Sequence, residues 1–334
     1  MQKLCFAAAA LFVLAIAVLV PSPALTESAF FTLYGQFTAL ASAFAILLVR
    51  TTRRQALRLG ARDWEKDAIE KVPTSMLAAC CIGGALVGAR LLYCLVRYDF
   101  YLFEVGLAGV LRIWEGGFLL YGAALGAVLA AVLLAKARGA DAWRLLDEIA
   151  APAMMAVSIC RMAEGMTTEG LGTWVENAFF CRFPFAVQNE WGEWQLAVYL
   201  FETAAAVVIL FYLLRQRRAA AGERFLTALL LYACCQIVLE SLRMDACLRI
   251  GFVRVSMVLS AVAAFAVTLI RALRVSKKQA AVCGGICFAL IAAAGIIEWA
   301  LDKTPVNNLL LYALMSACCA VIAFVGMRHI RREA

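Results

Sequence analysis

Long apolar segments alternate with short charged segments along this chain, a pattern typical of a helical protein that crosses a membrane many times. Most apolar segments approach the roughly 20 residues that a tilted helix needs to cross a hydrocarbon core of about 30 Å. No segment of barrel type, with strictly alternating polarity, interrupts them. We therefore predict an all-α polytopic membrane protein with about ten transmembrane helices, over residues 4–20, 31–50, 74–96, 117–136, 145–162, 195–214, 224–242, 254–270, 281–300 and 307–327.

Composition and charge agree with this class. Hydrophobic residues make up 65% of the chain and charged residues 16%, with a mean hydropathy of +0.86, which excludes a soluble globule. Of the 31 basic residues, 22 fall in every second connecting segment, Arg53 and Arg271 among them. One of these segments is the loop 51–71, which we expect to be solvated. Arg254 is assigned to an external segment. The positive-inside rule then predicts cytoplasmic termini, and the net charge of +8 gives no reason to invoke nucleic acid.

The first apolar segment has two interpretations. Lys3, an apolar run and then Ser22-Pro23-Ala24 fit either a retained membrane helix or a cleaved secretory signal with small residues at the cleavage site. The orientation of the later spans is the same in both cases.

Ionisable residues at membrane depth mark the first candidate site. The stretch 147–172 begins as an apolar helix and then brings Arg161, Glu164 and Glu169 within nine positions, followed by two glycines. A charge in hydrocarbon costs a few kcal/mol or more, so such residues face partners or a water-filled cavity and are functional by default. The alternative is a helix end whose charges reach the headgroups.

Further buried polar residues are predicted in other spans. Arg90 follows Gly84 and Gly88, whose spacing lets two helices approach closely, and should face the bundle and seek a carboxylate. Glu202 lies inside a span. Gln236, Glu240 and Arg243 stand at i, i+4 and i+7, a polar stripe that must look into the bundle.

Three other features are weaker signals. Tyr34-Gly35 sits at an interface, where a tyrosine is most often a belt residue, and Gly116-Gly117 precedes a helix start where another backbone or a ligand comes near. The external segment before residue 195 is rich in Trp and Phe, which predicts a small head region. The 13 cysteines fall mostly in spans and lack metal-ligand spacing, so no metal site and no cofactor are expected.

Together these segments resemble the prolipoprotein diacylglyceryl transferase family. Six motifs occur in its order and spacing: LYG at 33–35, VGARLLY at 87–93, IWEGG at 113–117, the stretch 147–172, QL at 195–196 with Glu202, and LYxxxxxxLExLRxD at 231–245. The similarity covers roughly residues 30–270. It implies a bacterial plasma-membrane enzyme that moves the diacylglyceryl group of phosphatidylglycerol onto the lipobox cysteine of a prolipoprotein and releases glycerol phosphate.

The resemblance also implies roles for individual residues. Arg161 matches the arginine of the family signature, Glu169 its downstream glutamate, and Glu240 and Arg243 the last conserved helix; with Tyr121 they form the predicted catalytic set. The predicted substrate-binding set is Tyr34, Arg90, Gly116, Gly117, Glu164, Gln195, Glu202 and Gln236. The partners are phosphatidylglycerol, or a related anionic phospholipid, and a prolipoprotein signal peptide with a lipobox.

This chain departs from the family at several of these positions. Tyr121 replaces the family's functional histidine, Gln236 a second arginine, and Cys160, Ala163 and Glu164 the signature glycines and asparagine. Two alternatives to a transferase therefore stay open. One is an inactive protein of the same fold that binds lipid or lipoprotein, and the other is a transporter, although no inverted repeat is visible.

The chain is predicted to divide into three parts. Residues 1–29 form an N-terminal membrane helix or signal anchor, and residues 30–272 the transferase-like bundle with an external head region over 163–194. Residues 273–334 form two additional C-terminal helices.

Overall fold

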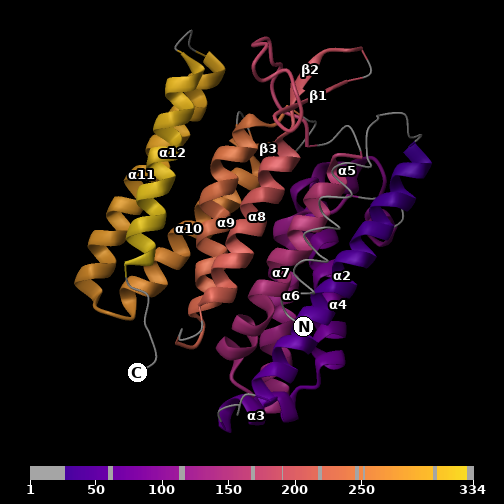
Figure 1. The fold of residues 1–334 in the computed structure, drawn as a ribbon, viewed down its shortest axis with the longest axis vertical. Helices are drawn as coiled ribbons and strands as arrows, with labels where there is room; N and C mark the ends of the chain where they lie inside the picture. Colours follow the sequence, from indigo (N-terminus) through magenta and orange to yellow (C-terminus); the bar gives the residue numbers. More distant parts are fainter. Residues whose placement is uncertain are drawn as a thin grey trace. The chain divides into compact units, whose positions relative to one another are not determined.

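A computed structural model describes residues 27–58, 63–112, 117–166, 170–189, 191–216, 220–244, 248–250, 253–303 and 307–328 (Figure 1). It divides into two compact units. The first comprises the described residues up to Ala45 and those from Ala150 onward, and the second comprises Ile46–Ile149. The predicted span 4–20 lies outside the described residues.

The structure is predominantly helical, as predicted. Seven helices of the described chain are long and apolar enough to cross a membrane: α4 (Thr74–Val96), α6 (Leu120–Arg138), α8 (Val198–Arg215), α9 (Glu223–Leu242), α10 (Val255–Leu273), α11 (Lys277–Lys303) and α12 (Asn308–Met327). The predicted spans 31–50 and 145–162 lie within α2 (Glu27–Arg58) and α7 (Ala142–Glu164). Charged residues at both ends of α7 keep it outside the apolar class. A count of ten spans thus stays a prediction.

The unit of Ile46–Ile149 is built on the contact between α4 and α6. Gly84 and Gly88 face Gly126 and Gly122, and a Cβ at any of these four positions would overlap the facing backbone. The close approach predicted for Gly84 and Gly88 is therefore confirmed, with the partner supplied by a second pair of the same spacing. Short helices follow α4 in this unit, namely α5 (Tyr98–Phe103) and the 3₁₀ helix η1 (Leu107–Leu111).

The prediction of a solvated loop over residues 51–71 is wrong. Helix α2 continues to Arg58, and α3 (Asp63–Lys71) forms most of the remainder. Arg53 is 5% exposed and donates to Glu148 Oε2 at 2.6 Å and to the Val72 carbonyl at 2.6 Å. The charge count of a loop does not show which of its arginines meets a carboxylate on a distant helix.

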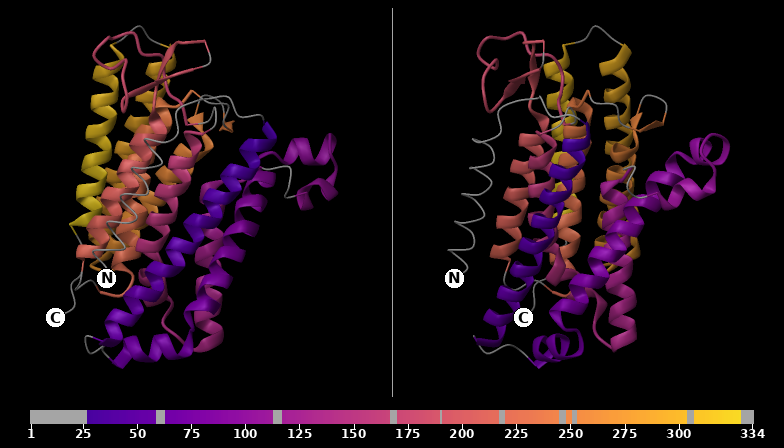
Figure 2. Two further views of the ribbon diagram at one scale, coloured as in Figure 1. Left: turned by 45° about the vertical axis from the view of Figure 1, so that its right-hand side comes forward. Right: turned by 90° about the vertical axis from the view of Figure 1, so that its right-hand side faces the viewer.

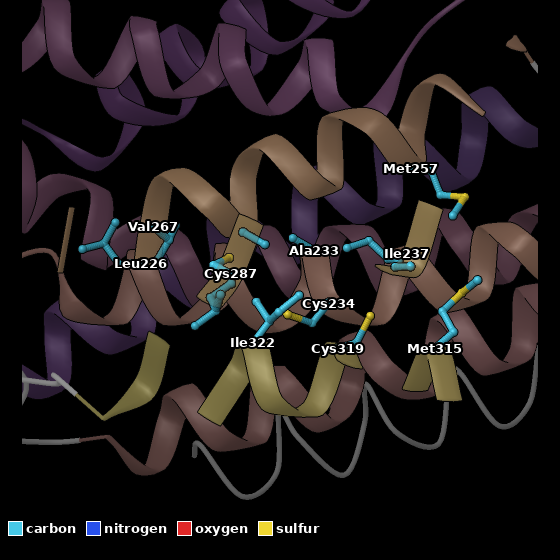
Figure 3. Packing of buried hydrophobic residues seen from close by; sticks show 13 residues of the cluster. Leu226, Ala233, Cys234, Ile237, Met257, Val267, Cys287, Met315, Cys319 and Ile322 are labelled. Carbon is cyan, nitrogen blue, oxygen red and sulfur yellow. The ribbon is translucent and has the colours of Figure 1, made fainter. Parts of the chain in front are cut away.

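Five helices, α8 to α12, pack together in the larger unit (Figures 1 and 2). Helix α10 contacts α9, α11 and α12, and α12 also contacts α9. Helices α9 to α12 share a core that holds Leu226, Ile237, Met315, Ile322 and neighbouring apolar residues (Figure 3). Cysteines from α9, α11 and α12 lie within this core as free thiols, which agrees with the apolar role predicted for them: Cys234, Cys287 and Cys319.

A buried ion pair fixes one end of this core. Arg271, wholly buried, donates to Glu223 Oε2 at 3.0 Å, to the Thr227 hydroxyl at 2.6 Å and to the Gly326 carbonyl at 3.1 Å. Arg274 donates to the other oxygen, Glu223 Oε1, at 2.9 Å. We call Glu223, Thr227, Arg271 and Arg274 the Glu223 cluster. It ties α9, α10 and α12 together, so Arg271, predicted only as a cytoplasmic basic residue, is a buried ion-pair residue.

Two short hairpins complete the fold. Strands β1 (Ala186–Gln188) and β2 (Trp194–Leu196) pair antiparallel with Val187 opposite Gln195, in the predicted head region. The head presents exposed aromatic side chains, among them Phe179, Phe183 and Trp191. Strands β3 (Arg249–Ile250) and β4 (Val253–Arg254) form the second hairpin, and α10 begins directly after it.

Candidate functional site

Six charged side chains from four segments of the larger unit meet in its interior. They are three arginines and three glutamates, each 8% exposed or less: Arg161, Glu164, Glu202, Glu240, Arg243 and Arg254. We call this group the Arg161 cluster. Helix α7 supplies two of its members, α8 one and α9 one, while Arg243 caps the end of α9 and Arg254 precedes α10.

Arg161 contacts all three carboxylates. Its Nη1 lies 2.7 Å from Glu164 Oε1 and 3.5 Å from Glu202 Oε2, and its Nη2 lies 3.8 Å from Glu240 Oε1. Glu164 is one helical turn away on α7, while the other two carboxylates come from α8 and α9. Only the first distance is that of a strong ion pair, so two of the three contacts are loose.

Arg243 shares two of these carboxylates. Its Nη1 lies 3.0 Å from Glu164 Oε2 and 3.0 Å from Glu202 Oε2. Glu164 and Glu202 therefore hold Arg161 and Arg243 side by side. Two guanidinium groups held at one place offer many N–H donors, which suits an anion with several oxygens, such as a phosphate.

Arg254 closes the cluster from the next hairpin. Its Nη1 lies 4.0 Å from Glu240 Oε2, and its Nη2 donates to the main-chain carbonyl of Arg243. At 2% exposed it is a buried cation, which its assignment to an external segment does not by itself indicate. With it the three arginines and three glutamates balance in formal charge, which lowers the cost of burying them.

Two further polar residues of α9 line the cluster. Arg161 donates to the Tyr232 hydroxyl at 3.4 Å, and Gln236 Nε2 donates to the same oxygen at 2.6 Å. Among the described residues, Glu202 Oε1 and Gln236 Oε1 are buried without a hydrogen-bond partner. Unpaired buried acceptors cost about 1–3 kcal/mol each and are rare in native interiors. The cluster therefore keeps unused acceptor capacity.

A glycine-rich turn sets the position of the end of α7. Gly170 has φ +76°, and a Cβ there would lie 2.9 Å from Tyr199 Cβ and 3.3 Å from Glu164 Cβ. At Gly172 a Cβ would lie 2.6 Å from Val198 Cγ2. Glycine is required here because the chain folds back against the start of α8.

The same turn holds the end of α9. Thr173 N donates to the Leu242 carbonyl at 3.2 Å, and Met244 N donates to the Leu171 carbonyl at 2.9 Å. These bonds flank Arg243 on both sides. The main chain that carries Arg243 is thereby fixed to the segment that follows Glu164.

The structure brings together six of the predicted site residues: Arg161, Glu164, Glu202, Gln236, Glu240 and Arg243. The polar stripe of α9 faces inward as predicted, with Gln236 1% and Glu240 4% exposed. Gln195 lies elsewhere, on strand β2 of the head hairpin. Glu169, Gly116 and the side chain of Tyr34 lie outside the described residues.

Three of the described site residues belong to the unit of Ile46–Ile149. Arg90 is buried as predicted, and its guanidinium donates to main-chain carbonyls, at 2.8 Å for Gly109, 3.0 Å for Val110 and 3.0 Å for Arg112. Gly117 has φ +76° and packs against the Tyr93 ring, so no side chain fits there. Tyr121 is buried in the first turn of α6.

Sequence reasoning missed Tyr232 and Arg254 as members of the site. Tyr232 stands one turn before Gln236, so extending the polar stripe backwards by four residues would have found it. Arg254 directly precedes an apolar helix, where a cation meets the unfavourable end of the helix dipole. Such a placement is itself a signal that a carboxylate lies nearby.

Within the described chain, no three His, Cys, Asp or Glu side chains are grouped so as to hold a metal ion. The carboxylates of the Arg161 cluster are instead paired with guanidinium groups.

Comparison with known proteins identifies the family of this chain. The model of the prolipoprotein diacylglyceryl transferase family matches residues 25–273, three quarters of the chain, close to the range expected from the motifs. A protein of Listeria innocua named phosphatidylglycerol–prolipoprotein diacylglyceryl transferase is 30% identical over 212 residues, which cover 61% of this chain and 76% of that protein. A protein of the same name from Bacillus licheniformis is 27% identical over 213 residues, covering 62% and 78%. This chain belongs to the prolipoprotein diacylglyceryl transferase family.

Proposed function

We propose that this protein is a membrane enzyme that transfers the diacylglyceryl group of phosphatidylglycerol to the lipobox cysteine of a prolipoprotein. Family membership supports this reaction, and the observation that carries it in this chain is the buried pair Arg161 and Arg243, held together by Glu164 and Glu202. The family match favours an active enzyme over an inactive lipid-binding relative.

The reaction replaces one bond to the glycerol carbon by another. The cysteine thiolate attacks the carbon that carries the phosphate ester, the C–O bond breaks as the C–S bond forms, and glycerol phosphate leaves with the electron pair. Charge develops on the phosphate oxygens, so preorganised cations accelerate the step. Arg161 and Arg243 are the groups that we assign to these oxygens.

A substrate phosphate would compete with the carboxylates that now occupy these arginines. Arg161 holds Glu202 at 3.5 Å and Glu240 at 3.8 Å, contacts that can be exchanged at little cost. Its 2.7 Å contact with Glu164 is stronger. Glu164 stands where the family has asparagine. We propose that its competition with the lipid phosphate for Arg161 raises the KM of this chain for phosphatidylglycerol.

The thiol must also lose its proton before attack. In this chain a tyrosine, Tyr121, replaces the family's histidine, and a phenol is a poor base at neutral pH. We assign the proton to Glu202, whose Oε1 lacks a hydrogen-bond partner within the described chain. Tyr121 then has the role of a hydrogen-bond donor to the lipid. The other roles stay predictions from the family resemblance. They are a catalytic role for Glu169 and substrate-binding roles for Tyr34, Arg90, Gly116, Gly117, Gln195 and Gln236.

We further propose that the protein lies in the bacterial cytoplasmic membrane with both termini in the cytoplasm. The alternation of basic segments supports this orientation. Reporters fused after Arg58, Arg138 and Lys278 should be cytoplasmic, and one inserted at Asn177 external. An external signal from the Arg138 fusion would contradict the orientation.

The direct test uses purified protein in nanodiscs that contain phosphatidylglycerol, with a lipobox peptide as acceptor. We expect a thioether-linked diacylglyceryl peptide and an equal amount of glycerol phosphate. A peptide with serine in place of cysteine is the control. Binding of the lipid and the peptide without product would replace the transferase by a binding protein.

A further inference from the structure

Helices α11 and α12 lie beyond residue 273, where the family match ends. They pack on α9 and α10 through the core that includes Met315, Cys319 and Ile322 (Figure 3). Polar side chains of these two helices also reach the end of α9 that carries the Arg161 cluster. Nothing in the family match assigns these residues a role.

The contact point is Ser241, which lies between Glu240 and Arg243 in the last turn of α9. The Ser241 hydroxyl donates to Glu298 Oε2 on α11, and its main-chain carbonyl accepts from the Tyr312 hydroxyl on α12 at 3.3 Å. The last carbonyls of a helix have no partner within the helix. Tyr312 supplies that partner, and Glu298 fixes the side chain of the same residue.

Helix α11 also contacts strand β4, which carries Arg254. The Nη1 of Arg254 lies 4.0 Å from Glu240, and its Nη2 donates to the Arg243 carbonyl. An acidic residue inside an apolar span is costly and tends to be functional. Glu298 is thus linked through Ser241 to the end of α9 that carries Arg243, and its helix also contacts the hairpin that carries Arg254.

We propose that Glu298 and Tyr312 are positioning residues of the transferase site, supplied by two helices that lie outside the family match. They hold the last turn of α9 so that Arg243 faces the substrate phosphate and Glu240 stays within reach of Arg161. This inference rests on the proposed function. It predicts that the C-terminal helix pair is part of the catalytic unit.

The test measures kcat, KM for the lipobox peptide and the thermal unfolding midpoint in phosphatidylglycerol nanodiscs. Glu298→Ala should lower kcat about tenfold, since displacements of about 1 Å at a reacting centre cost up to 10²-fold. Tyr312→Phe, which removes a single oxygen, should lower it severalfold. The matched control is Ser316→Ala, because Ser316 is exposed on α12 and its hydroxyl donates only to the Tyr312 carbonyl of its own helix.

Two further variants separate a role in positioning the site from a role in fold stability alone. Glu298→Gln keeps an acceptor for Ser241 and should recover part of kcat. Ser241→Ala combined with Glu298→Ala should be no slower than Glu298→Ala alone, because both remove the same contact.

The inference is overturned if Glu298→Ala and Tyr312→Phe match the control in kcat per folded molecule, whether or not their unfolding midpoints fall. If Glu298→Ala does not fold, Tyr312→Phe decides. A wild-type protein without transfer activity would instead overturn the proposed function.

Discussion

The Arg161 cluster and the Glu223 cluster lie in the same helical unit and share helix α9, yet their polar atoms are paired very differently. In the Glu223 cluster both carboxylate oxygens accept a guanidinium donor, at 3.0 and 2.9 Å. In the Arg161 cluster two ion pairs stretch to 3.8 and 4.0 Å, and Glu202 Oε1 is left without a partner in the described chain. A buried polar network whose groups are all hydrogen-bonded stabilises a fold. A network with unpaired groups is typical of a functional site, where a ligand can supply the missing partners.

The two clusters also differ in position. Glu223 opens α9 and Glu240 lies near its end, about 25 Å away at 1.5 Å per residue. One helix therefore carries a structural ion pair at one end and the candidate site at the other. Matched substitutions at the two ends can separate stability from activity.

The largest expected effect is that of Arg161→Ala. Without this guanidinium the phosphate loses its main cation, and we expect transfer to fall at least about 10³-fold, equivalent to about 4 kcal/mol. Product formation per folded molecule in nanodiscs measures it. Arg182→Ala, which removes an arginine stacked on Phe179 in the head, is the control and should retain activity. Equal activity of the two variants would place the site elsewhere.

Glu223→Gln should act on stability alone. It keeps the shape of the side chain but leaves Arg271 buried without a counter-charge, which costs about 3 kcal/mol or more. Chemical unfolding in detergent should show this loss, while activity per folded molecule stays within about twofold of wild type. A large loss of turnover with unchanged stability would remove the distinction between the clusters.

The same substitution at the other cluster, Glu202→Gln, should give the opposite result. Glu202 and Glu223 are both 0% exposed, so the pair is matched in burial. We expect kcat to fall about 10- to 100-fold because the proton acceptor is lost. The loss of stability should be smaller than for Glu223→Gln, since Glu164 still pairs with both Arg161 and Arg243. A destabilised variant with normal kcat would exclude Glu202 as the base.

The smallest effect is a gain. Tyr121→His together with Gln236→Arg restores two residues of the family and should raise turnover severalfold, measured at matched protein levels in membranes. Gln236 is only 1% exposed, so an added charge there must find a partner. Gln236→Leu is the control for loss of the amide. A folded double variant that binds lipid but turns over no faster would show that these replacements do not limit the rate.

Those parts of the fold and the site that depend on the pattern within a single helix could be predicted from the sequence. The stripe of Gln236, Glu240 and Arg243 has helical spacing, so its inward orientation could be predicted from α9 alone. The approach of α4 to its partner could be predicted from Gly84 and Gly88. These signals need only one helix and its period.

The rest depends on contacts between distant segments. The positive-inside rule places Arg53 and Arg271 in cytoplasmic segments because it counts charge near helix ends. It does not identify their ion-pair partners, Glu148 and Glu223. Arg254 joins the site because the β3–β4 hairpin turns the chain back over the end of α9. No spacing along one helix encodes such a return.

The central claim is that the Arg161 cluster is the catalytic site and the Glu223 cluster is structural. The most direct measurement is lipoprotein maturation in a cell depleted of its own transferase and supplied with wild type, Arg161→Ala or Glu223→Gln at matched membrane levels. The account predicts that wild type and Glu223→Gln restore maturation and that Arg161→Ala does not. Restoration by Arg161→Ala to the level of wild type would contradict it.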